Sequence, residues 1–496
     1  MDSQGGDGRA IIMRRRDLFL GAAAAAGVQA QTKPRNIVFI LCDDHRFDMM
    51  GCMGHPWLKT PNLDKLRAGG ALFQNAFVTT SLCSPSRASI LTGQYMHAHG
   101  VKDNFTPLPP SLATFPQLLQ KRGYRTGFLG KWHMGGDSDE PRPGFDDWIS
   151  FRGQGEYIDP TFNFNGTRRK VPGYVTDLLT EEARTFIQAN ASRPFMLYLS
   201  HKAVHSPFQP AQRHKEIYQH DPIPWPKSMM YKEEHYEQLP EWVKRRRYSR
   251  HGVDGAMGQT ASVDEYYRGY CRCLQAVDES VGRVMDELKS HGLLENTLVV
   301  YMGDNGYLWG EHGLVDKRSM HEPSLRVPIL AHCPSLFPAG TTVEKMALNL
   351  DIAPTFLDAA GIAAPQSMQG RSLLPLLQGK TAGWRTDFLY EYEWEQDYPY
   401  TPTLTGLRTE THSLMQSWGV WDMNELYDLR NDPDQLNNLL GNIKIRHRGR
   451  IGTLIQDKTL AKLVESMQDR MGEILKTTGG DPRYSGKGSE GDKFAM

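Results

Sequence analysis

Polar side chains follow four apolar segments of the sequence, at the point where each segment ends. The segments span residues 36–41, 124–129, 195–199 and 297–301, and their length and composition predict buried strands. The polar residues that follow them are Asp43, Asp44, Lys131, His133, His201, His205, Asp304 and Asn305. In open α/β sheets, ligands bind outside the carboxyl ends of the strands, so we expect these side chains to line one crevice. One such group alone is typical of a turn or a structural histidine, but four at the same strand end favour a functional site.

The candidate crevice offers oxygen ligands and positive charge together. Its oxygen donors, three of them carboxylates, are Asp43, Asp44, Asp304 and Asn305. Such donors suit a hard cation such as Ca²⁺ or Mg²⁺, whereas zinc more usually binds histidine or cysteine. A dication beside Lys131, Lys317 and the nearby histidines would make a strongly positive pocket, which complements a sulfate or phosphate ester. The residue types therefore predict an anionic ester as the substrate.

A further segment carries a motif of high specificity. Residues 83–93 read C-S-P-S-R-A-S-I-L-T-G, which contains the pattern C-x-P-S-R followed by L-T-G. On this motif, and on the order of the four strand ends, the chain resembles the type I sulfatases, which depend on formylglycine. The resemblance runs from about residue 34 to about residue 440 and includes the segments 130–133, 204–207, 303–306, 311–319 and 425–433. No core catalytic position departs from the family pattern.

The resemblance implies an unusual nucleophile at Cys83. In the family, a maturation enzyme oxidises this cysteine to formylglycine, and the hydrated aldehyde attacks the sulfate ester. A plain thiolate would not serve, because its adduct with sulfur has no internal way to break down. A geminal diol attacks with one hydroxyl group and expels sulfate with the other. The maturation enzyme is therefore an expected partner of the chain, together with a sulfated carbohydrate substrate.

The resemblance also implies roles for the other residues of the site. One divalent cation, with Ca²⁺ favoured over Mg²⁺, is expected among Asp43, Asp44, Asp304, Asn305 and an oxygen atom of residue 83. Arg87 is expected to orient the formylglycine, while Lys131 and Lys317 bind the sulfate oxygens. His133 is expected to act as the base for the elimination, and His205 is expected to protonate the leaving alcohol.

The residues after His205 bear on the choice of substrate. Residues 206–257 are rich in proline, aromatic and charged residues, and we expect this long insertion to lie at the lip of the cleft. The insertion and the segments 391–395 and 400–403 resemble bacterial sulfatases of the N-acetylglucosamine-6-sulfatase type. This resemblance implies an exo-acting carbohydrate 6-O-sulfatase that works on mucin or glycosaminoglycan sugars. Two alternatives stay open: a phosphonate or phosphate monoester hydrolase of the same superfamily, and a carbohydrate-binding relative without catalysis.

The elements that must position these residues predict an α/β fold. The resemblance implies an alkaline-phosphatase-like mixed sheet between helices, in a catalytic domain over residues 34–385. Apolar residues at spacings of three and four predict one long amphipathic helix over residues 267–288. A smaller C-terminal α+β domain is expected over residues 386–478, with a helix at 458–475, and a flexible tail is expected at 479–496.

Composition and charge exclude several classes of protein. The 496 residues contain 57 Lys and Arg against 57 Asp and Glu, so no basic excess supports nucleic-acid binding. The longest basic run, at residues 244–247, is expected to be a solvated helix face. Six cysteines are too few for a disulfide framework, so a single cysteine that matters is expected to matter through its chemistry.

The N-terminal residues 1–30 predict an export signal. Three arginines at residues 14–16 precede a short apolar run at 21–28, and a small-residue cleavage pattern ends at Ala30. Paired arginines before an apolar run suit a twin-arginine signal of a bacterium. The run is shorter than the roughly 20 residues that span a bilayer, so we expect an exported, periplasmic or extracellular protein without a membrane span.

Overall fold

The computed structural model describes residues 34–229, 233–256, 263–419, 422–443 and 455–486. The predicted export signal lies outside these residues, as does the end of the predicted tail from residue 487 onward. Within the described part of the chain, no helix combines the length and the apolar content that crossing a membrane requires.

Ten strands form the main sheet, in the order β13-β2-β12-β9-β1-β8-β4-β5-β6-β7. Four neighbouring parallel strands at its centre are β9 (Thr297–Gly303), β1 (Asn36–Cys42), β8 (Phe195–Ser200) and β4 (Arg125–Gly130). They are the four strands predicted from the sequence, and the prediction is confirmed. Leu41 of β1 is in register with Ser200 of β8 and with Met302 of β9, so the loops that follow these strands begin at the same level of the sheet.

The outer strands make the sheet mixed, as expected. They are β5 (Asp147–Ser150), β6 (Thr161–Phe164), β7 (Thr167–Lys170), β12 (Ile329–His332), β2 (Ala71–Phe73) and β13 (Thr341–Val343). β5 pairs parallel to β4, whereas β12 pairs antiparallel to β9 and β6 pairs antiparallel to β5. The sheet therefore has a parallel centre and contains antiparallel pairs on both sides of it.

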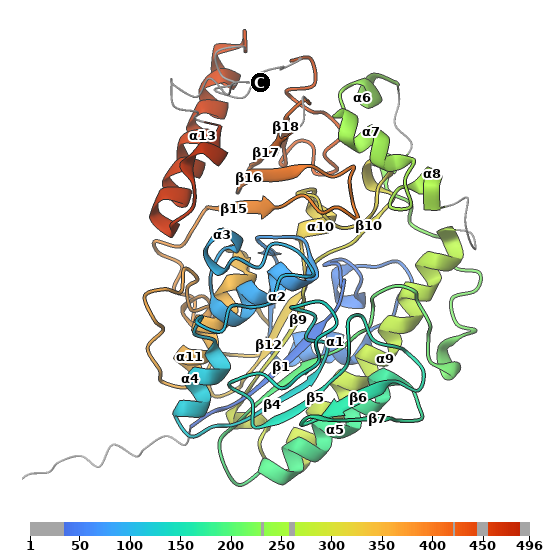
Figure 1. Cartoon of the computed structure of the whole chain (residues 1–496), viewed down its shortest axis with the longest axis vertical. Helices are drawn as coiled ribbons and strands as arrows, with labels where there is room; N and C mark the ends of the chain where they lie inside the picture. The colour runs from blue at the N-terminus through green and yellow to red at the C-terminus, as the bar shows by residue number, and fades with distance from the viewer. Residues whose placement is uncertain (1–33, 230–232, 257–262, 420–421, 444–454, 487–496) are drawn as a thin grey trace, which may run out of the picture. The chain divides into compact units, whose positions relative to one another are not determined.

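Successive residues of β1 point into two different hydrophobic cores. Ile37, Phe39 and Leu41 belong to one core, and Val38 and Ile40 belong to the other. The first core includes residues of α2 (Cys83–Thr92), α4 (Phe115–Lys121) and α11 (Ile352–Ala359), and the second includes residues of α1 (Pro61–Gly69), α5 (Val175–Asn190) and α9 (Val263–Ser290). Burial on both faces explains why the central strands are continuous apolar runs. Figure 1 shows the sheet between these helices, and α9 is the predicted long amphipathic helix.

A second, smaller sheet follows in the C-terminal part. It is an antiparallel meander of β15 (Asp387–Tyr392), β16 (Thr403–Thr409), β17 (His412–Trp418) and β18 (Glu425–Asp428). Helix α13 (Lys458–Thr478) packs against β15 and β16 and is the helix predicted over residues 458–475. The division of the chain into domains at residues 34–385 and 386–478 stays a prediction.

Short elements complete the framework around the sheets. They are β3 (Ala76–Phe77), β14 (Ala347–Leu348), β10 (Leu308–Trp309), β11 (Val315–Asp316), α3 (Met96–His99), α10 (Glu322–Leu325) and α12 (Leu374–Leu377). The insertion after His205 contributes α6 (Glu233–Glu237), α7 (Glu241–Arg247) and α8 (Val253–Ala256).

The basic run at the end of α7 differs from the sequence-based expectation. Arg245 is a solvated residue, with 71% of its side chain exposed, as predicted for the whole run. Lys244 and Arg247 have only 13% of their side chains exposed, and Arg246 is 2% exposed, so the prediction is wrong for these three residues. The guanidinium group of Arg246 lies among backbone carbonyl groups that hydrogen-bond with it, which allows a charged side chain to be buried without a carboxylate partner.

Candidate active site

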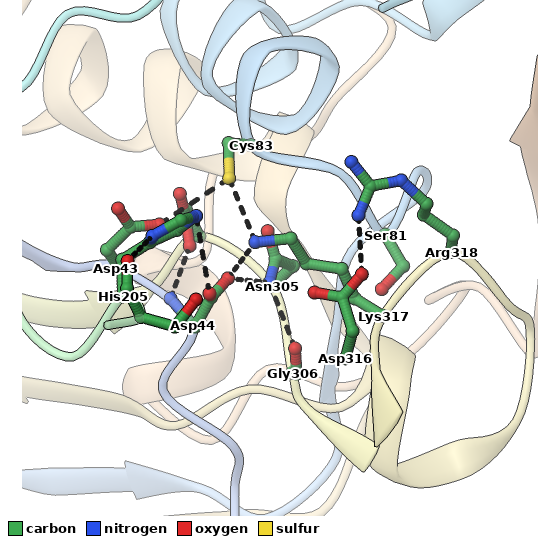
Figure 2. A network of polar contacts seen from close by, with 12 residues as sticks. Asp43, Asp44, Ser81, Cys83, His205, Asn305, Gly306, Asp316, Lys317 and Arg318 are labelled. Atoms are coloured by element: carbon green, nitrogen blue, oxygen red, sulfur yellow. Dashed lines mark hydrogen bonds and ion pairs between the residues drawn. The ribbon is translucent and has the colours of Figure 1, made fainter. Parts of the chain in front are cut away.

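The loops at the carboxyl ends of the central strands bring the predicted residues together. Asp43 and Asp44 follow β1, Lys131 follows β4, and Asp304 follows β9 directly. Cys83 is the first residue of α2, and its side chain points into the same cluster (Figure 2). All five side chains are buried. After β8, His205 Nε2 reaches the cluster at 3.9 Å from Oδ2 of Asp44, whereas His201 Nε2 lies 3.1 Å from Oγ of Ser280 on α9. The four strand ends therefore converge as expected, but His201 is not among the residues that they bring together.

Three charged side chains surround the sulfur atom of Cys83. The Nζ atoms of Lys317 and Lys131 lie 3.1 and 3.8 Å from Sγ, and Oδ1 of Asp43 lies 3.5 Å from it. Burial raises the pKa of the Cys83 thiol to about 12, although both ammonium groups act in the opposite direction. The unmodified thiol is therefore protonated at neutral pH, which makes it a poor nucleophile as it stands.

Each of the two lysines also contacts a carboxylate. Lys131 Nζ pairs with Oδ2 of Asp43, and Lys317 Nζ pairs with Oδ1 of Asp44. Figure 2 shows the Lys317 ammonium group between Asp44 and Cys83. Both cations thus lie between the acidic cluster and residue 83, where they can meet an anionic group attached to that residue.

The acidic cluster has the donors of a site for a hard cation. A carboxylate oxygen of Asp43, one of Asp304 and Sγ of Cys83 all lie within 4.8 Å of one another. Asn305 donates its amide to Oδ1 of Asp44 at 2.7 Å, and its own Oδ1 is buried without a hydrogen-bond partner among the described residues. A buried acceptor without a donor is costly, unless a cation occupies the space beside it. The donor set therefore fits Ca²⁺ or Mg²⁺.

The carboxylates of this cluster crowd one another electrostatically. Burial raises the pKa of Asp44 to about 7 against the lowering effect of Lys317, and the charges of Asp43 and Asp304 add to the rise. Burial and the Asp43 charge also raise the pKa of Asp304. Asp43 is equally buried, but the Lys131 ammonium beside it holds its pKa well below the usual range. Crowded carboxylates of this kind are stabilised by a bound dication.

Arg87 fixes the position of the acidic cluster. Its Nε and one terminal nitrogen lie 2.9 and 2.8 Å from Oδ2 of Asp304. The other terminal nitrogen donates to the carbonyl of Lys131 and to Oγ of Ser200, both at 2.7 Å. Because Arg87 is one turn beyond Cys83 on α2, it ties the helix to the ends of β4, β8 and β9.

The two predicted histidines lie on different sides of the cluster. His133 Nε2 is 2.9 Å from the Gln154 amide nitrogen, and its Nδ1 is 3.4 Å from Oγ of Ser84, next to Cys83. His205 Nε2 is 3.9 Å from Oδ2 of Asp44. Burial, followed by the Lys131 charge, lowers the pKa of both imidazoles well below the usual range, so both rings are neutral at neutral pH.

The neutral state of the two imidazole rings suits the predicted base, His133, better than the predicted acid, His205. A neutral imidazole can accept a proton, which suits the expected role of His133 as a base. His205 Nδ1 lies 2.7 Å from the carbonyl oxygen of Ser206, which only accepts, so Nδ1 carries the proton of the neutral ring. A His205 that acts as an acid through Nε2 must therefore first gain a proton there. The acid and base assignments stay predictions.

Arg246 is a residue that sequence reasoning missed. The backbone at Asp316 and Arg318, on both sides of Lys317, adopts the left-handed region, with φ of 81° and 75°. Arg246 donates hydrogen bonds to the carbonyl groups of Val315 at 3.0 Å and Lys317 at 2.5 Å. It thereby fastens the strained segment that carries a predicted sulfate-binding lysine. No sequence signal distinguishes it from Arg245, its exposed neighbour, because most of its partners are backbone carbonyl groups.

Two family models match the chain. Residues 35–362 match the model described as "Sulfatase". Residues 310–470 match the model described as "N-sulphoglucosamine sulphohydrolase, C-terminal". Together the two models cover both the main sheet and the second sheet.

Curated relatives and solved structures agree with these matches. The chain is 32% identical to N-acetylglucosamine-6-O-sulfatase of Bacteroides thetaiotaomicron, over 90% of this chain and 88% of the relative. It is 29% identical to human N-acetylglucosamine-6-sulfatase, over 84% of this chain and 83% of the relative. A structure solved in complex with its substrate D-glucosamine-2-N,6-O-disulfate superposes with a TM-score of 0.82 at 29% identity, over 91% of this chain and 99% of that one.

A more distant structure shares the fold. Phosphonate monoester hydrolase from Silicibacter pomeroyi superposes with a TM-score of 0.74 at 22% identity, over 90% of this chain and 96% of that one. At this identity the likeness concerns the arrangement of helices and strands.

Proposed function

The chain belongs to the sulfatase family, and we propose that this sulfuric ester hydrolase removes 6-O-sulfate groups from N-acetylglucosamine-type sugars at the ends of glycosaminoglycan or mucin chains. The observation that carries the proposal is the convergence of Lys131 and Lys317 on the sulfur of Cys83, beside buried carboxylates. Two ammonium groups at one reacting atom suit the transfer of a sulfate group. The choice of sugar rests on the relatives named for 6-sulfated glucosamine.

We propose that Cys83 acts only after a maturation enzyme has converted it to formylglycine. The raised pKa of the thiol supports this, because a protonated buried thiol is a weak nucleophile. Hydrated formylglycine supplies one hydroxyl group that attacks the sulfate ester and a second that expels sulfate. The start of α2 is a suitable place for this residue, since the positive end of a helix favours negative charge.

We propose that Asp43, Asp44, Asp304 and Asn305, with an oxygen atom of residue 83, hold one divalent cation, Ca²⁺ in preference to Mg²⁺. The unpartnered Oδ1 of Asn305 and the raised pKa values of Asp44 and Asp304 support this assignment. When bound, the cation supplies positive charge that polarises the sulfate ester.

The remaining residues are proposed to position the substrate and move its protons. Lys131 and Lys317 bind sulfate oxygens, since both point at residue 83. Arg87 orients residue 83 by holding Asp304 and the end of β4. His133 accepts the proton released in the elimination, and His205, once protonated at Nε2, donates a proton to the leaving alcohol.

Release of sulfate from a panel of esters tests the proposed function. The panel contains N-acetylglucosamine 6-sulfate, 2-O- and 3-O-sulfated sugars, an aryl sulfate and a phosphonate ester. The highest kcat/KM is expected on the 6-sulfated sugar. Preference for the phosphonate ester would instead identify a phosphonate monoester hydrolase, and sugar binding without turnover by correctly matured protein would identify a binding protein. Peptide mass spectrometry of active protein should show residue 83 about 18 Da lighter than cysteine, since thiol oxidation would add mass.

We also propose that the protein is exported to the periplasm or the cell exterior. The proposal rests on the arginines at residues 14–16 and the apolar run that follows them. Sequencing of the N-terminus of the protein recovered from the producing bacterium tests it. Cleavage after Ala30 is expected, and an intact N-terminus in cytoplasmic protein would contradict it.

A further inference from the structure

A pocket of about 360 Å³ lies between the end of α7 and the loop that joins β15 to β16. Its lining includes Arg250 and His251 from the insertion, and Asp397, Tyr398 and Tyr400 from the loop. Neither residue 83 nor the predicted cation ligands line it. A volume of this size accommodates a single sugar ring.

The pocket adjoins the segment that carries Lys317. Lys317 directs its ammonium group at Cys83, while its two neighbours contact residues of the pocket. Nδ1 of His251 lies 3.4 Å from Oδ2 of Asp316. The guanidinium group of Arg318 lies 3.3 Å from the centre of the Tyr398 ring. The pocket therefore adjoins the proposed sulfate site without being part of it, as a site for a neighbouring sugar must.

Two side chains of the pocket suit a sugar ring with hydroxyl groups. Tyr400 is 48% exposed and offers a ring face for the apolar side of a pyranose. The Asp397 carboxylate makes no ion pair within the described part of the chain and can accept hydrogen bonds from sugar hydroxyl groups.

Arg250 adds a positive charge to the lining of the pocket. It donates from Nε to Nε2 of His251 at 2.9 Å and from a terminal nitrogen to the Asp397 carbonyl at 3.3 Å. Across the described residues, no carboxylate lies within ion-pair distance of its guanidinium group. A guanidinium group without a carboxylate partner in the lining of a pocket is suited to a carboxylate or sulfate.

From these contacts we infer that the pocket binds the sugar next to the sulfated one, and that this second sugar carries an anionic group that pairs with Arg250. The inference rests on the proposed function, because it places the sulfated ring at residue 83. It narrows the substrate from any 6-sulfated terminal sugar to one followed by an acidic sugar. The anionic group is the carboxylate of a uronic acid or a second sulfate, because either can accept two parallel hydrogen bonds from one guanidinium group.

Four probes test the inference with matured protein. They are N-acetylglucosamine 6-sulfate alone, and the same sugar linked to a uronic acid, to neutral galactose or to 6-sulfated galactose. For the wild-type protein, kcat/KM is expected to be about tenfold higher on at least one acidic disaccharide than on the neutral one. The acidic disaccharide that shows the gain identifies the anionic group.

Substitutions in the pocket should remove the higher kcat/KM on the acidic disaccharide and leave the monosaccharide unaffected. Arg250→Ala is expected to lower kcat/KM about tenfold on the preferred acidic disaccharide, through KM, and to leave the monosaccharide within about twofold. Tyr400→Ala is expected to weaken all disaccharides alike, because stacking does not depend on charge. The matched controls are Arg245→Ala and Tyr248→Ala, whose side chains are 71% and 66% exposed outside the pocket lining. Both should behave as the wild-type protein.

Several results would overturn the inference. Equal rates on all four probes would do so, and so would a loss in Arg250→Ala that is as large on the monosaccharide as on the disaccharides. Failure of the proposed function looks different, because the wild-type protein would then release no sulfate from any of the four sugars. In that case the Kd values of the same sugars, measured by calorimetry, test whether the pocket binds the second sugar. Equal Kd values for the wild-type protein and Arg250→Ala would overturn the inference.

Discussion

Two clusters of buried ionisable side chains lie close together in this molecule and are built differently. The catalytic cluster surrounds residue 83 and contains Asp43, Asp44, Asp304, Arg87, Lys131 and Lys317. The joining cluster ties residues 318–322 to the second sheet and its first loop, and contains Arg318, Glu395, His321, Glu425, Glu322 and Arg408. All twelve residues are buried.

In the joining cluster, the described side chains satisfy one another. Glu395 accepts from Arg318 at 2.7 Å and from the Tyr392 hydroxyl at 2.9 Å. Glu322 lies 3.1 Å from Nε of Arg408, and the pair is enclosed between α10 and β16. Beside the catalytic cluster, by contrast, Asn305 donates to Asp44 and keeps an oxygen without a partner among the described residues. A cluster that leaves acceptors unused has room for a ligand, whereas a satisfied cluster holds the fold together.

Shifted pKa values alone would not separate the two clusters. Burial raises the pKa of Asp44 in the catalytic cluster to about 7, and it raises the pKa of Glu425 in the joining cluster to the same value. Burial disfavours the charged carboxylate wherever it occurs. The distinction lies in the atoms that stay unpartnered and in the approach of two lysines to one sulfur atom.

The largest expected effect is the loss of activity in Cys83→Ala. Removal of the residue that both lysines approach should lower kcat by at least about a thousandfold, because the nucleophile is gone. The thermal midpoint should change little, since the side chain is small. Cys42→Ala is the matched control, because Cys42 is another buried cysteine at the end of β1 and its sulfur contacts backbone carbonyl groups. Residual activity above a few per cent in Cys83→Ala would contradict the proposed nucleophile.

Arg408→Ala should show the opposite pattern, with stability lost and activity kept. The substitution removes the arginine that donates to both oxygens of the buried Glu322 carboxylate. This loss is expected to lower the free energy of unfolding by about 3 kcal/mol. Chemical denaturation followed by circular dichroism measures this loss. The kcat/KM of folded protein should stay within about twofold of wild type, because Arg408 touches no residue of the catalytic cluster.

A matched surface arginine sharpens this test. Arg470 pairs with Asp387 at the edge of the same sheet, with 46% of the arginine side chain exposed. Arg470→Ala should cost less than about 1 kcal/mol, since solvent screens an exposed pair. Equal losses in the two variants would show that Glu322 and Arg408 do not form a buried structural pair.

Arg246→Ala should lower activity by a smaller amount than Cys83→Ala. Without its guanidinium group, the left-handed segment around Lys317 loses its hydrogen bonds to the helix end. We expect kcat/KM to fall about a hundredfold, mainly through kcat, because Lys317 is then misplaced in the transition state. Arg246→Lys should recover part of the loss, and Arg245→Ala should have no effect. A loss of stability with unchanged kcat in the folded fraction would contradict the positioning role.

Sequence patterns predict the two clusters unequally. Part of the catalytic cluster could be predicted because Asp43, Asp44, Lys131 and Asp304 follow apolar strands, whose carboxyl ends meet at one edge of the sheet. The remaining members, Cys83, Arg87 and Lys317, are expected there because their segments resemble those of the type I sulfatases. Arg246 could not be predicted, since it bonds to backbone carbonyl groups, and these leave no trace in residue types. The joining cluster pairs Glu322 with Arg408, 86 positions apart, and that pairing depends on how the second sheet packs. The fold class follows from local patterns and the proposed nucleophile from the resemblance of one motif, whereas the supports of the site depend on tertiary contacts.

The smallest expected effect concerns Glu425 and the pH dependence of stability. Its ordinary pKa of 4.5 is raised to about 7 in the folded protein by burial, with the Tyr427 hydroxyl 2.7 Å away acting in the opposite direction. Burial also lowers the pKa of the neighbouring His321 to about 3, so this histidine supplies no positive charge at neutral pH. The folded state therefore binds a proton at Glu425 that the unfolded state has released. The resulting contribution to stability is present below pH 4.5 and is lost as the pH rises through about 7.

Glu425→Gln mimics the protonated side chain at every pH and should remove this loss. Between pH 5 and pH 7.5, the free energy of unfolding of the wild-type protein should fall relative to the variant by about 2 kcal/mol. Denaturation curves of both proteins at a series of pH values measure the difference between their free energies of unfolding. In this difference the contributions of all other titrating groups cancel. Sulfate release by the folded variant should match the wild type, because Glu425 belongs to the joining cluster. If the free energies of unfolding of the two proteins instead changed in parallel with pH, Glu425 would have an ordinary pKa in the folded protein. Its pKa would then differ from that of Asp44.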